Sequence, residues 1–583
     1  MSPENLRAGT GVGRADRLRH PRDHLASGVA LYQVGRVHRA AHDCESSNQS
    51  ANLVSGRGHI ARSSYASDMP DGRLSLAELL AALSLATDLG NGFSYEKTLR
   101  TTLLATRLGE LAGLAGAELS DTWYTSILRY TGCTAYAYEM SQAFGDEIAV
   151  KHRFAPVDSR FPKDAMRAVL EGVGKDEGPL RRARHIVHDM RAGMRLFPFM
   201  AAADCEAVGR YCKRLALSPG VAGAVVCMFE RWDGKGAPRK LSGEGIPMPS
   251  RLNHVAHIAE VHCGIGGRNA AKAMIERGRG GWFDPAIAEL FLLNADDLVA
   301  EIEAESVFDA AVAAEPEPRL TIGAAQLDDL ARTFADFVDL KSPYTLTHSS
   351  GVARLAEAAA ITAGLAEKEV DDLRRAGLLH DLGRASVPNG IWDKPGPLSP
   401  AERERVRLHA YHSERVLAAS PLLAHLAPIA GMHHERLDGS GYHRGNSAAG
   451  QSMPARILAA ADVFHALIEE RPHRPAFALG DAAKEIGAMV TAGLLDAQAV
   501  SAVSEAAGHK VSAHRDAPAG LTEREIDVLR LIARGSTKKD VAAALFISPA
   551  TAHTHVVHIY EKIGASTRAG AALFAMEHDL LEG

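Results

Sequence analysis

An internal repeat limits how this chain can fold more than any other feature of its sequence. Residues 97–116 (KTLRTTLLATRLGELAGLAG) align without gaps with residues 348–367 (HSSGVARLAEAAAITAGLAE), and the same offset carries SILRYTG onto GLLHDLG. Further along, residues 229–251 align without gaps with residues 434–456. Two stretches that keep their frame indicate that one helical domain occurs twice in the chain.

The second copy carries a set of histidines and aspartates that suits metal binding. In AGLLHDLGRA (376–385) an apolar run delivers adjacent imidazole and carboxylate groups, and Gly383 lets the helix end or bend so that both face one ion. Apolar residues with helical spacing follow His348. Imidazole and carboxylate suit Fe, Mn or similar ions, and this set is large enough for two divalent ions. The candidate ligands are His348, His380, Asp381, His409, His433, His434 and Asp462.

Any one of these histidines alone is more simply a residue on a helix surface, so the prediction rests on the whole set. The first copy lacks that set, and we expect no metal there. Two interpretations of the first copy stay open: a packing partner for the second copy, or a regulatory half that binds an anion at its Arg- and Lys-substituted positions. The aligned positions hold Lys97 for His348, Arg129 and Tyr130 for His380 and Asp381, Asp204 for His409, Met228 and Phe229 for His433 and His434, and His257 for Asp462.

Three motifs within 323–500 together resemble the HD-GYP family of metal-dependent cyclic-dinucleotide phosphodiesterases: HDLGR, HHERLDGSGYH and PARILAAADVFHALIEERPHR. The resemblance implies one metal ion held by His348, His380, Asp381 and Asp462, and a second held by His409, His433 and His434, with Asp381 bridging the two. It makes Asp381, Arg384 and Glu435 candidate catalytic residues, with Glu435 supporting the site rather than binding metal. The candidate substrate contacts are Arg384, Gly441, Tyr442, Arg471 and Arg474.

The chain departs from the family pattern at four positions. Arg384 replaces the usual Lys, His443 replaces the Pro of the GYP motif, and His465 replaces a second Asp of the closing helix. Tyr344 stands where an acidic residue one turn before His348 would allow a third metal, so two ions are expected. Arg384 keeps the positive charge as a planar fork.

The resemblance implies hydrolysis of a cyclic dinucleotide, most simply cyclic di-GMP. Divalent ions activate water and, with arginine side chains, stabilise charge on phosphate oxygens. Two alternatives stay open. The domain senses a nucleotide without hydrolysing it and serves a transcription factor, or it hydrolyses a different nucleotide.

The C-terminal segment, 521–583, predicts a helix-turn-helix. Thr522 and Glu525 form a capping box before an amphipathic helix that ends at Gly535, and a second helix covers 537–545. Ser548 and Pro549 supply the N-cap and first turn of a third helix over 549–563. This pattern resembles the LuxR-type (NarL/FixJ-like) domain, which implies binding of double-stranded DNA through the third helix.

The candidate DNA contacts lie on the second and third predicted helices and just after them. Because 521–583 is not net basic, we expect modest, salt-sensitive affinity for phosphates. A helical protein-interaction module that no longer binds DNA is the alternative. The candidates are Lys538, Lys539, Thr551, His553, Thr554, His555, His558, Lys562 and Arg568.

Composition agrees with an all-α, cytoplasmic regulator. Aromatic residues make up only 5% of the chain, which favours helices, and the six cysteines form no CxxC pair, as expected for reduced thiols. A net charge of −6 gives no general argument for nucleic acid or membrane binding. We expect a homodimer in which the nucleotide site alters the disposition of the DNA-binding domain.

The predicted domain order has six parts. Residues 1–69 form a disordered extension, with a basic nucleic-acid-binding arm as the alternative, because they lack apolar periodicity. A degenerate HD-like domain (70–302) follows, then a linker (303–322), the metal-dependent HD-GYP-like domain (323–507), a second linker (508–520) and the helix-turn-helix domain (521–583). Below, the "first copy" is 70–302 and the "second copy" is 323–507.

Overall fold

The structure is a computed structural model that describes residues 73–157, 162–172, 179–303, 306–508 and 518–581. The predicted extension at 1–69 lies outside these residues, as does most of the second predicted linker. The described chain is helical apart from two short strands, which confirms the all-α prediction. None of its helices is both long enough and apolar enough to span a membrane.

Each copy is a bundle of helices. The first copy contains α2 (Leu76–Gly90), α3 (Lys97–Leu111), α4 (Gly116–Ile127), α5 (Ala137–Phe144), α6 (Glu147–Phe154), α7 (Pro162–Gly172), α8 (Pro179–Arg214), α9 (Pro219–Val225), α10 (Met248–Gly278) and α11 (Pro285–Ile302). The second contains α13 (Ala324–Asp339), α14 (His348–Thr362), α15 (Glu367–Leu379), the 3-10 turn η3 (Leu382–Ser386), α16 (Asn389–Trp392), α17 (Pro400–Ala418), α18 (Ala427–Gly431), α19 (Met453–Ile468), α20 (Leu479–Thr491) and α21 (Ala497–Gly508).

The start of α3 repeats in detail at the start of α14. Both helices follow a residue with a left-handed backbone, Glu96 at φ 66° and Thr347 at φ 69°. In the first copy, the Asp88 carboxylate accepts hydrogen bonds from the backbone N–H and hydroxyl of Thr98. In the second, Asp339 accepts the same pair from Ser349, each at 2.8 Å. Residues that align in the sequence repeat therefore also have equivalent positions in the structure at this point.

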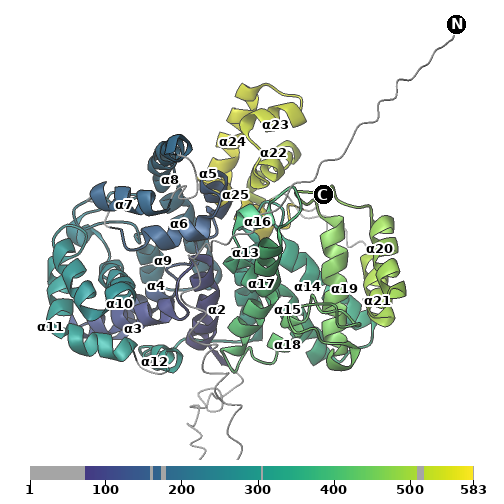
Figure 1. Cartoon of the computed structure of the whole chain (residues 1–583), viewed down its shortest axis with the longest axis horizontal. Coiled ribbons are helices and arrows are strands. Elements are labelled where there is room, and N and C mark those ends of the chain that lie inside the picture. The colour runs from purple at the N-terminus through teal and green to yellow at the C-terminus, as the bar shows by residue number, and fades with distance from the viewer. Residues whose placement is uncertain (1–72, 158–161, 173–178, 304–305, 509–517, 582–583) are drawn as a thin grey trace, which may run out of the picture. The chain divides into compact units, whose positions relative to one another are not determined.

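One hydrophobic core extends through both copies, and a second core lies within the first copy. Helix α2 of the first copy packs against η3 and α17 of the second, and Figure 1 shows it beside these green helices. A buried ion pair joins Lys341 Nζ to Glu147 Oε1 at 2.5 Å, and the backbone N–H of Asn389 donates to the same carboxylate. This is the contact that the packing-partner interpretation of the first copy requires.

The segment that we expected to be a linker, 303–322, instead contains regular structure. Helix α12 (Val307–Ala313) buries Val307 and Ala311, and strand β2 (Thr321–Ile322) pairs antiparallel with β1 (Leu74–Ser75). The Tyr124 hydroxyl donates to the buried Glu315 carboxylate. The acidic, proline-containing sequence suggested an exposed connection, but a few apolar residues at helical spacing are enough to pack it on the first copy.

The C-terminal segment forms α22 (Glu523–Ala533), α23 (Lys538–Ala544), α24 (Pro549–Ile563) and α25 (Arg568–Glu577). Thr522 and Glu525 form the predicted capping box, Gly535 has φ +86°, and Ser548 caps α24. The sequence reasoning named three helices and missed the fourth. Helix α25 packs against α8 of the first copy.

Candidate metal centre

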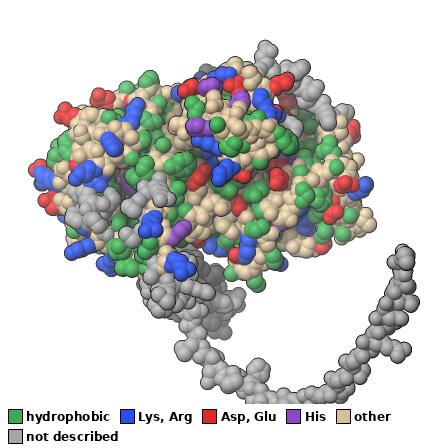
Figure 2. All heavy atoms as spheres, turned by 90° about the horizontal axis from the view of Figure 1, so that it is seen from above, with side chains coloured by type: hydrophobic (Ala, Val, Ile, Leu, Met, Phe, Trp, Pro, Cys, Tyr) green, Lys and Arg blue, Asp and Glu red, His purple; other side chains and the backbone are tan. Residues whose placement is uncertain are grey.

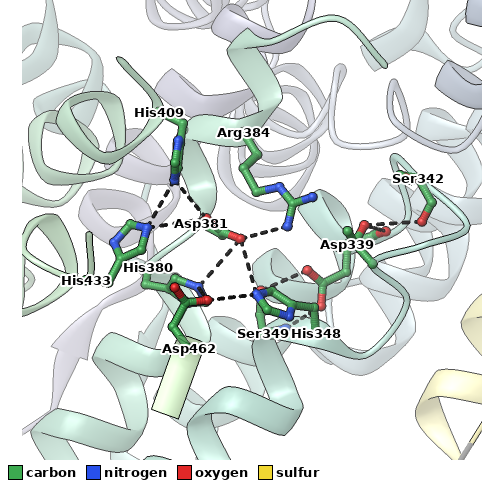
Figure 3. A network of polar contacts seen from close by, with 12 residues as sticks. Asp339, Ser342, His348, Ser349, His380, Asp381, Arg384, His409, His433 and Asp462 are labelled. Atoms are coloured by element: carbon green, nitrogen blue, oxygen red, sulfur yellow. Dashed lines mark hydrogen bonds and ion pairs between the residues drawn. The ribbon is translucent and has the colours of Figure 1, made fainter. Parts of the chain in front are cut away.

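All seven predicted ligands lie together inside the second copy, and Figure 3 labels six of them, all except His434. They come from five places: the start of α14, the two residues between α15 and η3, the middle of α17, the turn after α18, and α19. Six of the seven are buried and His434 is half-buried. Five separate segments bring these side chains to one interior point. This is typical of a preorganised site and not of histidines clustered on a surface.

Asp381 lies between two groups of ligands. Its Oδ1 is 3.4 Å from His409 Nε2 and 3.7 Å from His433 Nε2. Its Oδ2 is 3.6 Å from His348 Nε2 and 3.5 Å from His380 Nε2. The two carboxylate oxygens therefore face different sets of imidazoles, as a bridging ligand requires.

Asp462 joins the group formed by His348 and His380, and it also approaches His434 of the other group. Its Oδ1 lies 3.3 Å from His348 Nε2 and 3.8 Å from His380 Nε2, while its Oδ2 lies 3.7 Å from His434 Nδ1. Groups of donors close enough to share an ion include His348 with His380 and Asp462, and His409 with His433 and His434. The donor chemistry and its division into two groups fit two divalent ions.

Backbone hydrogen bonds fix how three of the imidazoles face. The Nδ1 atoms of His380, His409 and His433 lie 2.5–2.7 Å from the carbonyl oxygens of the residues three positions earlier. A donated Nδ1–H leaves the lone pair on Nε2, which points into the site. His380 Nε2 is buried and has no hydrogen-bond partner. An inward, unsatisfied lone pair of this kind suits a metal ion.

For Asp381 and His433 the surroundings favour the protonation states that bind metal, whereas at His348 burial is outweighed by Glu469 and Asp462, which raise the pKa of that imidazole to about 10. Burial opposes ionisation of Asp381, yet the charges of His380 and Arg384 hold the pKa of its carboxyl well below the usual range. Burial, with the neighbouring His380 and His409, lowers the pKa of His433 to about 3. Near neutral pH the carboxylate is therefore charged and this imidazole neutral, which are the forms that coordinate cations.

Arg384, a predicted catalytic and substrate-contacting residue, faces the centre. Its Nη1 donates to Asp381 Oδ2 at 2.8 Å, and its guanidinium lies 4.3 Å from the centroid of the Trp392 ring. The planar guanidinium makes the hydrogen bond to Asp381 and the contact with the Trp392 ring at the same time, whereas the Lys of the family pattern has no planar group.

The loop of the altered GYP motif lies against the histidines. The Tyr442 ring centroid is 4.8 Å from that of His434, and a Cβ on Gly441 would lie 2.4 Å from Glu435 Cα, so only glycine fits there. The buried Glu435 carboxylate accepts hydrogen bonds from the backbone N–H groups of Arg444, Gly445 and Asn446. Glu435 therefore organises this loop.

Arg471 and Arg474 are engaged within their own segment. Arg471 Nη2 donates to Glu469 Oε2 at 2.6 Å, and Arg474 Nη1 donates to the backbone carbonyl of Leu467 at 3.0 Å. They lie near the site but bind the end of α19. The sequence reasoning missed Glu469, whose contact with His348 joins residues 121 positions apart.

The first copy places a buried lysine amine at the equivalent point, and burial lowers the pKa of this amine to about 7. Lys97 Nζ lies 2.6 Å from both His257 Nδ1 and the Tyr130 hydroxyl, and Arg129 donates to Asn253. Among the described residues, groups that could hold a metal all lie in the second copy.

Most of the predicted DNA contacts on α23 and α24 are exposed. On α24, Thr551, His553, Thr554 and His558 are exposed and His555 is half-buried, while Lys538 and Lys539 are exposed at the start of α23. Figure 2 looks onto the end of the molecule that carries α23 and α24 in Figure 1, and histidines and basic side chains gather on that face.

Three of the predicted basic contacts already have protein partners. Lys538 Nζ lies 2.6 Å from His553 Nδ1, and Lys562 Nζ lies 2.7 Å from Glu525 Oε2. Arg568 pairs with Glu139 of the first copy at 2.6 Å. Beside it, Glu206 accepts hydrogen bonds from Ser566 and Thr567 at the start of α25. Arg568 is therefore part of the contact between the helix-turn-helix and the first copy.

Comparison with known proteins agrees with both halves of this description. Residues 332–499 match the family model described as HD domain, and residues 519–575 match that of bacterial regulatory proteins of the luxR family. A 3′3′-cGAMP-specific phosphodiesterase of Vibrio cholerae is 30% identical over 411 residues, which cover 70% of this chain and 89% of the relative. A cyclic di-GMP phosphodiesterase of Thermotoga maritima is 34% identical over 167 residues, 28% of this chain and 45% of the relative.

A solved structure extends the likeness to the fold. The crystal structure of a cyclic GMP-AMP specific phosphodiesterase of V. cholerae superposes with a TM-score of 0.53 and 26% identity, over 75% of this chain and 99% of the other. The matched part is far longer than the second copy alone, so both copies take part. The chain belongs to the HD-GYP family of cyclic-dinucleotide phosphodiesterases and carries a LuxR-type domain at its C-terminal end.

Proposed function

We propose that this protein hydrolyses a cyclic dinucleotide at the second copy and binds DNA through its C-terminal domain. The observation that carries the first part is the position of Asp381, whose two oxygens face two separate groups of imidazoles. We propose that His348, His380, Asp381 and Asp462 hold one divalent ion, and that Asp381, His409, His433 and His434 hold another. Fe and Mn suit such a nitrogen- and oxygen-rich set.

The bound ions would supply an activated water and stabilise negative charge on the phosphate. The chain's own residues do the rest. Arg384, whose guanidinium lies over the Trp392 ring, presents a positive charge beside Asp381, where it can stabilise a phosphate oxygen. Tyr442 lies against His434 and closes one side of the site, on a loop that Glu435 holds in place.

The substrate in this proposal is a cyclic dinucleotide. The simplest expectation from the motifs was cyclic di-GMP. The relative whose similarity extends over 411 residues is named for 3′3′-cGAMP, which supports that compound as the better substrate. A direct comparison of turnover on the two compounds by the full chain, loaded with Mn²⁺ or Fe²⁺, decides between them. Equal inactivity on both, with metal bound, would favour the sensor that binds nucleotide without hydrolysing it.

For the C-terminal domain we propose sequence-specific binding of α24 in the major groove, by a homodimer on two half-sites. The exposed Thr551, His553, Thr554 and His558 support this role. Selection of genomic fragments by the full chain at low salt tests it, and analytical ultracentrifugation tests the dimer. A selection that enriches no fragment would favour a protein-interaction module instead. Both activities reside in one chain, and we propose that nucleotide bound at the second copy regulates DNA binding.

A further inference from the structure

His348 is oriented differently from the other buried imidazoles of the centre. His380, His409 and His433 are each fixed by the backbone carbonyl three residues earlier. His348 is the first residue of α14, and the corresponding carbonyl, that of Thr345, accepts the backbone N–H of His348 at 3.0 Å. The Nδ1 atom of His348 contacts a side chain instead.

Another residue supplies the missing acceptor. Glu469 directly follows α19, and its Oε2 lies 2.9 Å from His348 Nδ1. On the other side of the same ring, Nε2 lies 3.3 Å from Asp462 and 3.6 Å from Asp381. The imidazole thus spans the distance between a carboxylate outside the centre and the carboxylates within it.

We infer that Glu469 is a positioning residue for the metal centre. It accepts the Nδ1–H of His348, which fixes the tautomer and turns the Nε2 lone pair toward Asp381 and Asp462. A carboxylate in this place also makes the imidazole a stronger donor than a carbonyl would. This inference rests on the proposed metal centre and names a residue that acts on it through His348.

The rest of the Glu469 environment supports that role. Its Oε1 lies 3.2 Å from His465 Nδ1, and its Oε2 also accepts from Arg471 Nη2 at 2.6 Å. These two contacts hold the carboxylate against His348. They also give Arg471 a role in the structure other than the predicted contact with substrate.

The first copy provides an internal comparison. Lys97 aligns with His348, and a carboxylate of the closing helix approaches it as well: Glu260 Oε2 lies 3.9 Å from Lys97 Nζ. Glu260 aligns with His465, one helical turn before Glu469. Both copies therefore set an acidic side chain against the first residue of this helix, but they take it from successive turns.

A third metal ion is the competing explanation, because His348, His465 and Glu469 also lie close enough to share one. However, Arg471 Nη2 lies 3.4 Å from His348 Nδ1 and 2.6 Å from Glu469 Oε2. The guanidinium brings a positive charge to the position that an ion would need. The arrangement favours a hydrogen-bonded carboxylate over a ligand.

The test compares Glu469→Ala and Glu469→Gln with wild type in the full, metal-stripped chain, by calorimetric titration with Mn²⁺ and by metal analysis. Glu470→Gln is the matched control, because Glu470 is the exposed neighbour. We expect Glu469→Ala to weaken one of two Mn²⁺ sites by about 10- to 100-fold, and Glu469→Gln to weaken it less, since an amide oxygen still accepts a hydrogen bond. The other site and the control should match wild type.

Different outcomes separate the claims. Mn²⁺ affinities of both Glu469 variants within about twofold of wild type would overturn the role of Glu469 while leaving the metal centre intact. Loss of one whole ion from three, with unchanged affinity for the other two, would overturn it in favour of a third site. A wild-type chain that binds no Mn²⁺ would overturn the proposed metal centre and this inference with it. If Glu469→Ala does not fold, the nearly isosteric Glu469→Gln carries the comparison.

Discussion

Replacing Glu435 with Gln should loosen the loop of the altered GYP motif by an amount that the structure allows us to work out. The carboxylate accepts three backbone N–H groups, from Arg444 at 2.7 Å, Gly445 at 3.1 Å and Asn446 at 2.9 Å. Hydrogen bonds to a charged acceptor contribute roughly 1.5 kcal/mol each or more. The amide keeps one accepting oxygen without its charge, and its NH₂ group opposes the remaining backbone donor.

We therefore expect a loss of roughly 2–3 kcal/mol in local stability, which corresponds to about 30- to 150-fold faster amide exchange in this loop. Hydrogen exchange with mass spectrometry on the peptide that covers 440–448 measures it. Turnover should fall with it, because the same loop carries Tyr442 beside His434.

The repeat supplies a matched control. Glu230 aligns with Glu435 and accepts the backbone N–H groups of Arg239 and Leu241 at 2.6 and 2.9 Å. Glu230→Gln should speed exchange in the loop at 236–243 and leave metal binding and turnover unchanged. Unchanged exchange at 444–446 in Glu435→Gln would refute the reasoning, and so would an equal loss of turnover in both variants.

Two further predictions concern the first copy. Burial raises the pKa of Asp204 to about 7, from 3.8 for an ordinary aspartate. Between these two pH values the folded chain holds this proton and the unfolded chain has lost it, so the free energy of unfolding falls as the pH rises. Asp204→Asn should gain on wild type by up to roughly 4 kcal/mol between pH 4 and 8; thermal unfolding measures this, and parallel curves for the two proteins would contradict it. A double variant in which Ala replaces both Glu139 and Glu206 should release Arg568 and the start of α25, and so strengthen the binding of duplex DNA at low salt. The slope of log affinity against log salt concentration should become steeper by about 0.9, because one more phosphate contact forms. Fluorescence anisotropy measures both quantities, and an unchanged affinity and slope would show that this contact does not restrain DNA binding.

Sequence reasoning identified the candidate ligands that the structure brings together, because their chemistry is visible in the residues. Histidines and aspartates at seven positions, and their loss at the aligned positions of the first copy, needed no tertiary information beyond the repeat. The capping residues Thr522 and Ser548 likewise mark helix starts locally.

The features that were missed depend on contacts between distant segments. Nothing in the local sequence indicates that Glu469 reaches His348, 121 positions away, or that Arg471 and Arg474 bind the end of α19. The acidic run around Pro316 reads as an exposed linker until Glu315 meets Tyr124. Arg568 reads as a phosphate contact until it meets Glu139.

The most direct test of the account measures metal content and turnover of 3′3′-cGAMP and cyclic di-GMP together, on wild type and on His433→Ala. We predict two divalent ions per wild-type chain and hydrolysis of at least one of the two compounds, with the substitution removing a buried imidazole from the group around Asp381 and abolishing turnover. Metal bound and nucleotide bound tightly by wild type, without hydrolysis of either compound, would contradict an enzyme and make the protein a nucleotide-sensing regulator.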